Sequence, residues 1–144
     1  MSDLLLIVTL AGQRVAIPAD QVEGVVEIDA LVPVPRAPAH IAGLAALRSR
    51  VLTVIDGAAS IGFEPSAAAV LREAVLVEAD GHPYAILVDS VEDVVERTGE
   101  VKPARTAPGD GWGRVARGTV EPGGDLLLLI DIQALIAGPA AQAA

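Results

Sequence analysis

The sequence of 144 residues has no cysteine and only two histidines, His40 and His82. Without cysteine the chain cannot form a disulfide, use a thiol nucleophile, or hold an iron–sulfur cluster or a cysteine-ligated zinc ion. Two histidines, neither near an acid or a serine that suggests a relay, leave little for a metal site or a catalytic triad. Both are interpreted as surface or satisfied core side chains, and the sequence predicts no cofactor.

Aromatic residues and positive charge are also scarce. Aromatics make up 2 % of the chain, and 10 lysines and arginines face 19 acids, which gives a net charge of −9. A field of that sign repels phosphate backbones and anionic membranes, so no nucleic-acid partner is expected. The longest apolar runs, such as Leu4–Ala11 and Leu126–Ile130, are far shorter than the roughly 18–20 residues that cross a bilayer. We therefore expect a soluble cytoplasmic protein that does not insert into a membrane.

What the sequence does contain is 52 % apolar residues in short runs rich in valine, isoleucine and leucine. Such runs, separated by glycine and proline, predict a mainly β protein with only short helical turns. Two hairpins stand out. The segments 4–10 and 14–17 flank Ala11-Gly12-Gln13, and the segments 72–79 and 84–88 flank Asp80-Gly81-His82-Pro83, with glycine available for a positive φ.

The chain also repeats itself. Residues 4–27 align with residues 73–96 at an offset of 69 without a gap, with ten identities in 24 positions, including Gly12/Gly81 and the D-x-V-E-x-V-V-E segment. Residues 51–61 match residues 126–136 at an offset of 75. We infer one domain over 1–144 that contains two similar β subdomains, about 4–61 and 73–136, arranged as paired barrels because two repeats are too few for a solenoid. Ala67-Ala68-Ala69 lies between them, and the tail 138–144 is expected to fray.

Three aspartates each close an apolar run: Asp56, Asp89 and Asp131. Carboxylates at neighbouring strand ends could bind a divalent cation, which would suit a metal-dependent enzyme. Aspartate at a strand end also caps the turn or helix that follows, and the repeat explains the spacing without a metal. The capping interpretation is favoured, and no metal site or catalytic residue is assigned.

Two further features suggest binding rather than catalysis. Arg48 and Arg50, two apart on a predicted strand, would share a face and could either keep an edge from aggregating or anchor a partner's carboxylate. Trp112, the only tryptophan, lies in the glycine-rich segment PGDGWGR. An exposed tryptophan could be a binding hot spot, but packing over the edge of the core is the favoured interpretation.

The segment HIAGLAALRSRVLTVID (residues 40–56) resembles the signature of the CheW-like domain family, with the family spacing matched at Gly43, Leu47, Arg48 and Asp56. The segments AILVDSVEDVVE (85–96), VKP (101–103) and the closing LLLLIDIQALI (126–136) are similar to family motifs in the same order. The resemblance spans about residues 4–137. The family's usual Asn and Gly around the arginine are replaced here by Ala46 and Ser49, and the residue after Asp56 is Gly57 rather than leucine.

The resemblance implies two SH3-like five-stranded β-barrels with short helical turns and a short C-terminal helix. It also implies a non-enzymatic cytoplasmic adaptor that couples the tips of chemoreceptors to a CheA-type histidine kinase in chemotaxis, with a receptor helix held in an apolar groove between the barrels. The departures at Ala46, Ser49 and Gly57 also suggest an adaptor of a CheA-like pathway that controls pili, development or transcription. The residues expected to contact partners are Gly43, Leu47, Arg48 and Arg50, with Val22, Val25, Leu44 and Ala45 as candidates for the groove.

Overall fold

A computed structural model describes residues 4–63, 72–96, 101–102, 110–121 and 126–138. Within them the strands are β1 (Leu4–Leu10), β2 (Gln13–Pro18), β3 (Val22–Ile28), β4 (Ile41–Leu47), β5 (Arg50–Asp56), β6 (Arg72–Ala79), β7 (His82–Leu87), β8 (Ser90–Glu96), β9 (Ala116–Val120) and β10 (Leu127–Ile130). A 3-10 turn, Ala19–Gln21, precedes β3, and short helices are α1 (Gly57–Ile61), α2 (Asp110–Val115) and α3 (Ile132–Ala137). The mainly β prediction and the short C-terminal helix are confirmed. Ala67-Ala68-Ala69 and the tail beyond residue 138 lie outside the described residues.

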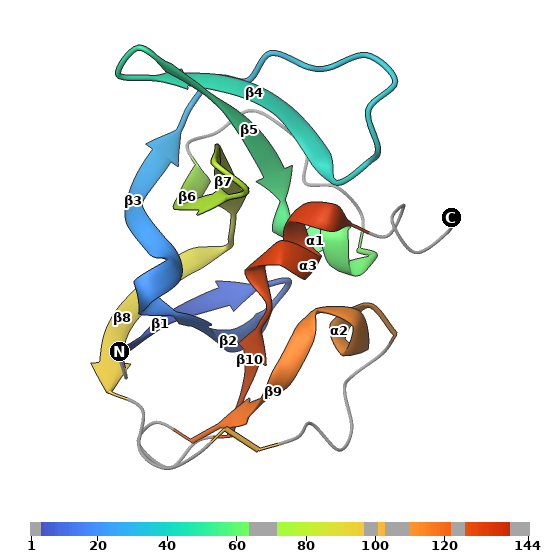
Figure 1. Cartoon of the computed structure of the whole chain (residues 1–144). Coiled ribbons are helices and arrows are strands. Elements are labelled where there is room, and N and C mark those ends of the chain that lie inside the picture. The colour runs from blue at the N-terminus through green and yellow to red at the C-terminus, as the bar shows by residue number, and fades with distance from the viewer. Residues whose placement is uncertain (1–3, 64–71, 97–100, 103–109, 122–125, 139–144) are drawn as a thin grey trace.

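The strands form two five-stranded sheets: sheet A with the order β8-β1-β2-β10-β9, and sheet B with the order β3-β6-β7-β5-β4 (Figure 1). The expected ranges 4–61 and 73–136 do not coincide with these sheets, because each half of the chain supplies strands to both. The hairpin of one half pairs with the third strand of the other: β1 with β8, and β6 with β3. The repeated segments therefore occupy equivalent places in two interlocked sheets.

Each sheet curls until the chain beyond one edge strand reaches the other edge. Val32, four residues past β3, exchanges two backbone hydrogen bonds with Leu44 of β4, both 2.9 Å long. Lys102, beyond β8, makes the equivalent bridge to Thr119 of β9. These bridges give both sheets the barrel-like form that the repeat suggested.

The central strands bury both of their faces, which explains why their apolar runs do not alternate with polar residues. One face of each sheet packs into that sheet's own interior, while the other meets a core shared by both sheets and the helices. Adjacent residues of β10 illustrate this, because Leu129 faces the interior of sheet A and Ile130 faces the shared core. The shared core contains Leu6, Val8, Leu10, Val15, Ile17, Ile55, Ile61, Val75, Val77, Ile86, Val88, Trp112, Val115, Leu128, Ile130, Ile132 and Leu135.

The three helices contact one another beside the shared core, between the two sheets (Figure 1). Trp112 lies on α2, a short helix rather than a loop, and is only 3 % exposed. The preferred interpretation of Trp112 as a core residue is therefore confirmed. No helix among the described residues is long and apolar enough to span a bilayer.

Candidate functional site

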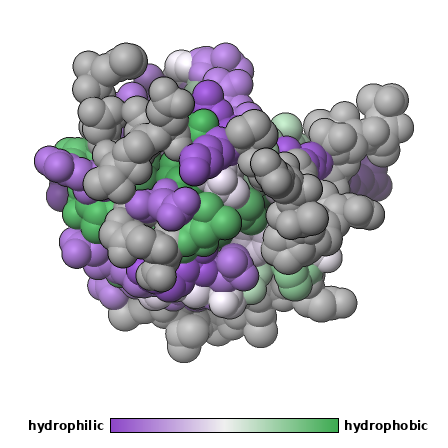
Figure 2. All heavy atoms as spheres, turned by 90° about the horizontal axis from the view of Figure 1, so that it is seen from below, coloured by the Kyte–Doolittle hydropathy of each residue, from purple (hydrophilic) through white to green (hydrophobic). Residues whose placement is uncertain are grey.

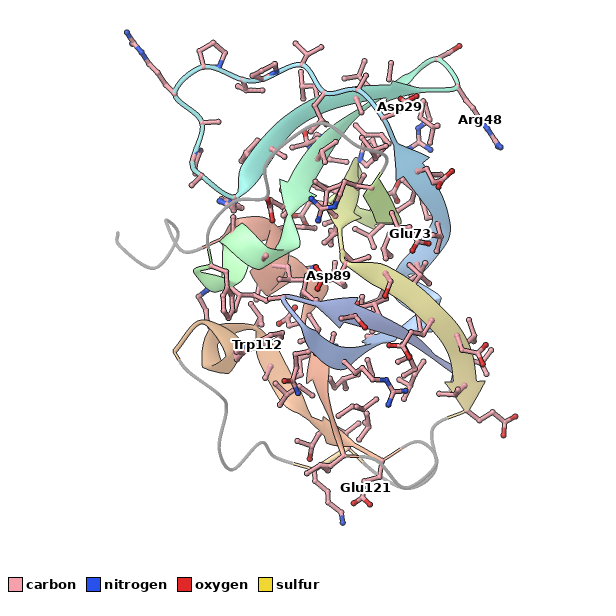
Figure 3. All side chains as sticks on the ribbon, turned by 180° about the vertical axis from the view of Figure 1, so that it is seen from behind. Asp29, Arg48, Glu73, Asp89, Trp112 and Glu121 are labelled. Atoms are coloured by element: carbon pink, nitrogen blue, oxygen red, sulfur yellow. The ribbon has the colours of Figure 1, made fainter. Side chains whose placement is uncertain are left out.

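Arg48 does not lie on a strand, as the sequence suggested, but in the two-residue turn between β4 and β5. Leu47 pairs with Arg50, so the turn consists of Arg48 and Ser49 alone. Both have positive φ, 49° and 71°, which defines a type I′ turn. The sequence missed this turn because it lacks the usual Asn-Gly or Asp-Gly pair. Arg48 projects from the tip of the hairpin (Figure 3).

A pocket lies beside this tip, and three of the expected partner residues line it: Leu47, Arg48 and Arg50. Its apolar wall comes from strands β5, β6 and β7, and Glu23 of β3 adds a carboxylate. We define the Arg48 pocket as the surface lined by Glu23, Leu47, Arg48, Arg50, Leu52, Leu76, Val77, Pro83 and Tyr84. No hydrogen bond or ion pair joins the side chains of Arg48, Arg50 or Glu23 to any described residue. Two cations thus stand over an apolar surface and are open to a ligand.

The other expected partner residues do not gather in one groove. Val22 packs against the shared core, Ala45 faces the interior of sheet B, and Val25 is exposed on the edge strand β3. Gly43 is buried where the chain passes Val32, and a Cβ there would meet the Val32 carbonyl oxygen at 2.6 Å. Gly43 therefore permits the bridge between Val32 and Leu44.

The surface depression beside α3 also differs from the apolar groove that was expected between the barrels. It is lined by residues from the 3-10 turn, β3, β6 and the start of α3, and most of them are polar: Asp20, Gln21, Glu23, Glu78, Ile132 and Gln133. Three of the six are acidic. The depression shares Glu23 with the Arg48 pocket.

Two of the three aspartates, Asp56 and Asp131, cap the helix that follows them, as favoured from the sequence, whereas Asp89 binds the distant β1–β2 turn. Asp56 accepts a hydrogen bond from the Ala59 amide, and Asp131 accepts from the amides of Gln133 and Ala134, so each caps the helix that follows it. Asp89 accepts from the Gly12 amide at 2.8 Å. No group of three or more histidine, aspartate or glutamate side chains that could hold a metal occurs in the described part of the chain.

The end of α3 carries a polar cluster that sequence reasoning did not find. Three consecutive carbonyl oxygens of this helix accept from side chains of other segments: Ala134 from Arg114 of α2, Leu135 from Ser60 of α1, and Ile136 from His40, just before β4. Arg114 also donates to the Ser60 carbonyl oxygen. Burial lowers the pKa of the Arg114 guanidinium, which nonetheless stays charged near neutral pH.

This cluster joins the three helices by hydrogen bonds. Because α1 directly follows β5 of sheet B and α3 directly follows β10 of sheet A, it also holds the two sheets together. It also explains His40, which is 3 % exposed and donates through Nε2 to the Ile136 carbonyl oxygen at 2.9 Å. His82 is exposed at the start of β7. His82 therefore fits the expected surface role, whereas His40 is a core side chain satisfied only at Nε2, because its buried Nδ1 has no hydrogen-bond partner among the described residues. No local pattern around Arg114 predicts a contact with carbonyls so distant in sequence.

Two interlocked five-stranded sheets, joined by hydrogen bonds among three short helices and bearing a surface pocket bordered by two arginines, define a small domain of paired β-barrels. A model of the CheW-like domain matches residues 4–140, so the chain belongs to the CheW-like domain family.

Relatives at the level of sequence and structure carry related names. The chain is 29 % identical over 111 residues to the probable chemotaxis protein CheW of Rhizobium etli, covering 76 % of this chain and 72 % of that one. It is 27 % identical over 124 residues to the chemotaxis protein CheW of Thermotoga maritima, covering 86 % and 81 %. The crystal structure of the scaffolding protein TtCheW from Thermoanaerobacter tengcongensis superposes with a TM-score of 0.78 over 90 % of this chain and 89 % of that one, at 20 % identity, which supports the shared fold.

Proposed function

We propose that this protein is a non-enzymatic cytoplasmic adaptor that couples chemoreceptors to a CheA-type histidine kinase. Membership of the CheW-like family and the names of its relatives, chemotaxis and scaffolding proteins, support this role. The observation that carries the proposal for this chain is the Arg48 pocket, where two guanidinium groups with no hydrogen bond or ion pair to a described residue border an apolar wall.

The chemistry of the pocket suits a protein partner. A partner's aliphatic or aromatic side chain would lose water against Leu52, Leu76 and Tyr84, which is favourable in proportion to the apolar area buried. A carboxylate next to that side chain would form charge-assisted hydrogen bonds with the guanidinium groups. Glu23 would repel any further carboxylate of the partner. This repulsion would favour the one position of the partner in which its carboxylate meets the arginines.

We assign kinase docking to this pocket, with Leu47, Arg48 and Arg50 as contacts and Val25 on the neighbouring edge strand. Gly43 and Leu44 act indirectly, because they hold the hairpin against the chain that precedes it. The receptor tip is assigned to the depression beside α3, where amide and carboxylate side chains favour a partner helix with lysine, arginine or amide side chains over a purely apolar one.

The test is a reconstitution with three purified components: this protein, a CheA-type kinase from the same cell that lacks its own adaptor, and membranes bearing a chemoreceptor. We expect the protein to join kinase to membrane in a sedimentation assay and to change kinase autophosphorylation. The matched pair Arg48→Glu and Arg117→Glu separates docking from net charge, since Arg117 is exposed on β9, away from the pocket. Absence of binding and of any change in autophosphorylation, across all CheA-type kinases of that cell, contradicts the proposal.

A further inference from the structure

The two sheets place equivalent glutamates at equivalent β-bulges. In sheet A the register of β1 against β8 shifts at Glu92, and in sheet B the register of β6 against β3 shifts at Glu23. Each glutamate is therefore the extra residue of a bulge, a feature that redirects a side chain away from the regular ladder. The two glutamates are 69 positions apart, which is the offset of the repeated segments. Sheet A thus shows what a carboxylate at this place binds.

The Glu92 carboxylate is bound by two side chains of its own sheet. Arg14 donates from Nε to Oε1 at 3.0 Å and to Oε2 at 3.3 Å, and the Thr9 hydroxyl donates to Oε2 at 2.8 Å. Thr9 and Arg14 are paired across β1 and β2, so both reach the bulge from one side of the sheet. The charge of Glu92 is therefore balanced within the chain.

Sheet B has the glutamate without these donors. The pair equivalent to Thr9 and Arg14 is Glu78 and Pro83, which face each other across β6 and β7. Proline has no side-chain donor, and an ionised glutamate can only accept. No hydrogen bond or ion pair joins the side chain of Glu23 or Glu78 to any residue that the structure describes. Two carboxylates thus occupy the place where sheet A combines a carboxylate with a guanidinium and a hydroxyl.

We infer that a partner supplies the guanidinium that sheet B lacks, as an arginine side chain bound by Glu23 and Glu78 in the depression beside α3. Both glutamates line that depression together with Asp20, and none of its described lining residues is cationic. The planar fork of an arginine can donate to two carboxylates at once, and like charges on neighbouring strands favour a cation between them. The Arg48 and Arg50 side chains border the neighbouring pocket, but neither forms an ion pair with Glu23.

The apolar surface at the other end of the molecule lacks such an indication of its occupant. Figure 2 shows the end where β8 lies, with green apolar atoms bordered by purple hydrophilic residues. Val94 of β8 is 49 % exposed, and its equivalent on β3, Val25, is 42 % exposed. Because the same side chain is open in both sheets, the repeat shows no contact that a partner would replace. At the bulge, by contrast, one sheet contains the arginine and the other does not.

The identity of the partner rests on the proposed function, in which the receptor tip covers this depression. Two variants with the same change of charge test the contact in a sedimentation assay with chemoreceptor membranes. Glu23→Gln should weaken binding roughly tenfold, because a charge-assisted contact is lost. Glu92→Gln should bind like the parent but unfold at slightly lower urea, because it breaks the pair with Arg14. If the parent binds and Glu23→Gln binds equally well, the inference is overturned while the proposed function stands.

An exchange of charges identifies the arginine itself. Glu23→Arg should abolish receptor binding, and replacement of one arginine of the receptor tip by glutamate should restore it. Each arginine and lysine of the tip is replaced in turn. Restoration by none of them, or by a lysine alone, contradicts an arginine at Glu23.

A third measurement needs no partner and so separates this inference from the proposed function. Glu78→Thr combined with Pro83→Arg reproduces in sheet B the Thr9–Arg14 pair of sheet A. This variant should unfold at higher urea than the matched Glu78→Thr, Pro83→Gln variant, and a further Glu23→Gln substitution should remove the gain. It should also lose receptor binding, because its own arginine occupies the site. No gain in the urea midpoint would show that the bulge does not hold a guanidinium, which overturns the inference even if the parent binds both receptor and kinase.

Discussion

Three hairpins of this protein share one turn geometry and differ in what surrounds it. The β1–β2, β6–β7 and β4–β5 hairpins all close through two residues of positive φ: Ala11-Gly12, Asp80-Gly81 and Arg48-Ser49. The first two hairpins supply central strands that are covered on both sides. The third has β4 at a sheet edge, cations at and beside its tip, and a pocket on one side.

This comparison indicates that equivalent hairpins of a duplicated fold have different roles. In the two central hairpins the second turn residue is glycine, which adopts positive φ without a steric penalty. In β4–β5 that position is Ser49, and an L-residue there costs about 1–2 kcal/mol. The hairpin with the less favourable turn is the one that displays Arg48, so we interpret β4–β5 as the hairpin devoted to binding rather than to folding.

The largest expected effect concerns what the hairpins have in common, the shared core. Ile17 of β2 and Ile55 of β5 are both at most 1 % exposed there. Truncation of either to alanine removes buried methyl groups and leaves a cavity, and should lower the free energy of unfolding by about 2–5 kcal/mol. Urea denaturation, followed by the fluorescence of Trp112, measures this. Each variant should unfold in one transition, and separate transitions for the two sheets would contradict a shared core.

The next effect tests the glycine turns. In Gly12→Ala and Gly81→Ala the new Cβ meets no atom within 4 Å, so only the positive φ opposes it. We expect each variant to lose about 1–2 kcal/mol of stability, measured by the same urea titration. Gly24→Ala, on β3 and without a positive φ, is the control. If both turn variants are as stable as the parent, strain does not distinguish the hairpins.

The reverse substitution should sharpen the comparison. Ser49→Gly relieves the strain of the left-handed conformation but gives the unfolded chain more freedom, so a net gain of about 0.5–1 kcal/mol is expected. Thermal unfolding followed by circular dichroism provides the measurement, with Ser49→Ala as a control that should gain nothing. A stability loss in Ser49→Gly would mean that the serine side chain makes a contact essential to the turn.

Much of this architecture could be read from the sequence because its signals are local. Gly12 and Gly81 marked two hairpins, and Asp56 and Asp131 were identified as caps, since each of these effects involves residues a few positions apart. The internal repeat predicted two similar barrels, and the interlocked sheets have that equivalence.

The features that were missed from the sequence depend mostly on contacts between residues far apart in the chain. Nothing in residues 22–28 shows that β3 pairs with β6 of the other half rather than with its own hairpin. The Arg48-Ser49 turn carries no glycine or asparagine, so a strand was predicted through Arg48. Arg114 reaches carbonyl oxygens on α1 and α3, 54 and 20 residues away in sequence, and no periodicity encodes such contacts.

The central claim, that the β4–β5 hairpin is the docking element, is tested most directly by calorimetric titration of the regulatory domain of a CheA-type kinase with Arg48→Glu. Because Arg48 is exposed in a turn, its substitution should change the stability of the fold by about 0.5 kcal/mol or less. Loss of a charge-assisted contact of about 1.5–3 kcal/mol should weaken binding roughly tenfold or more. Arg117→Glu, with the same change of charge, should bind like the parent. Equal affinity of Arg48→Glu and the parent protein for the kinase would contradict the claim.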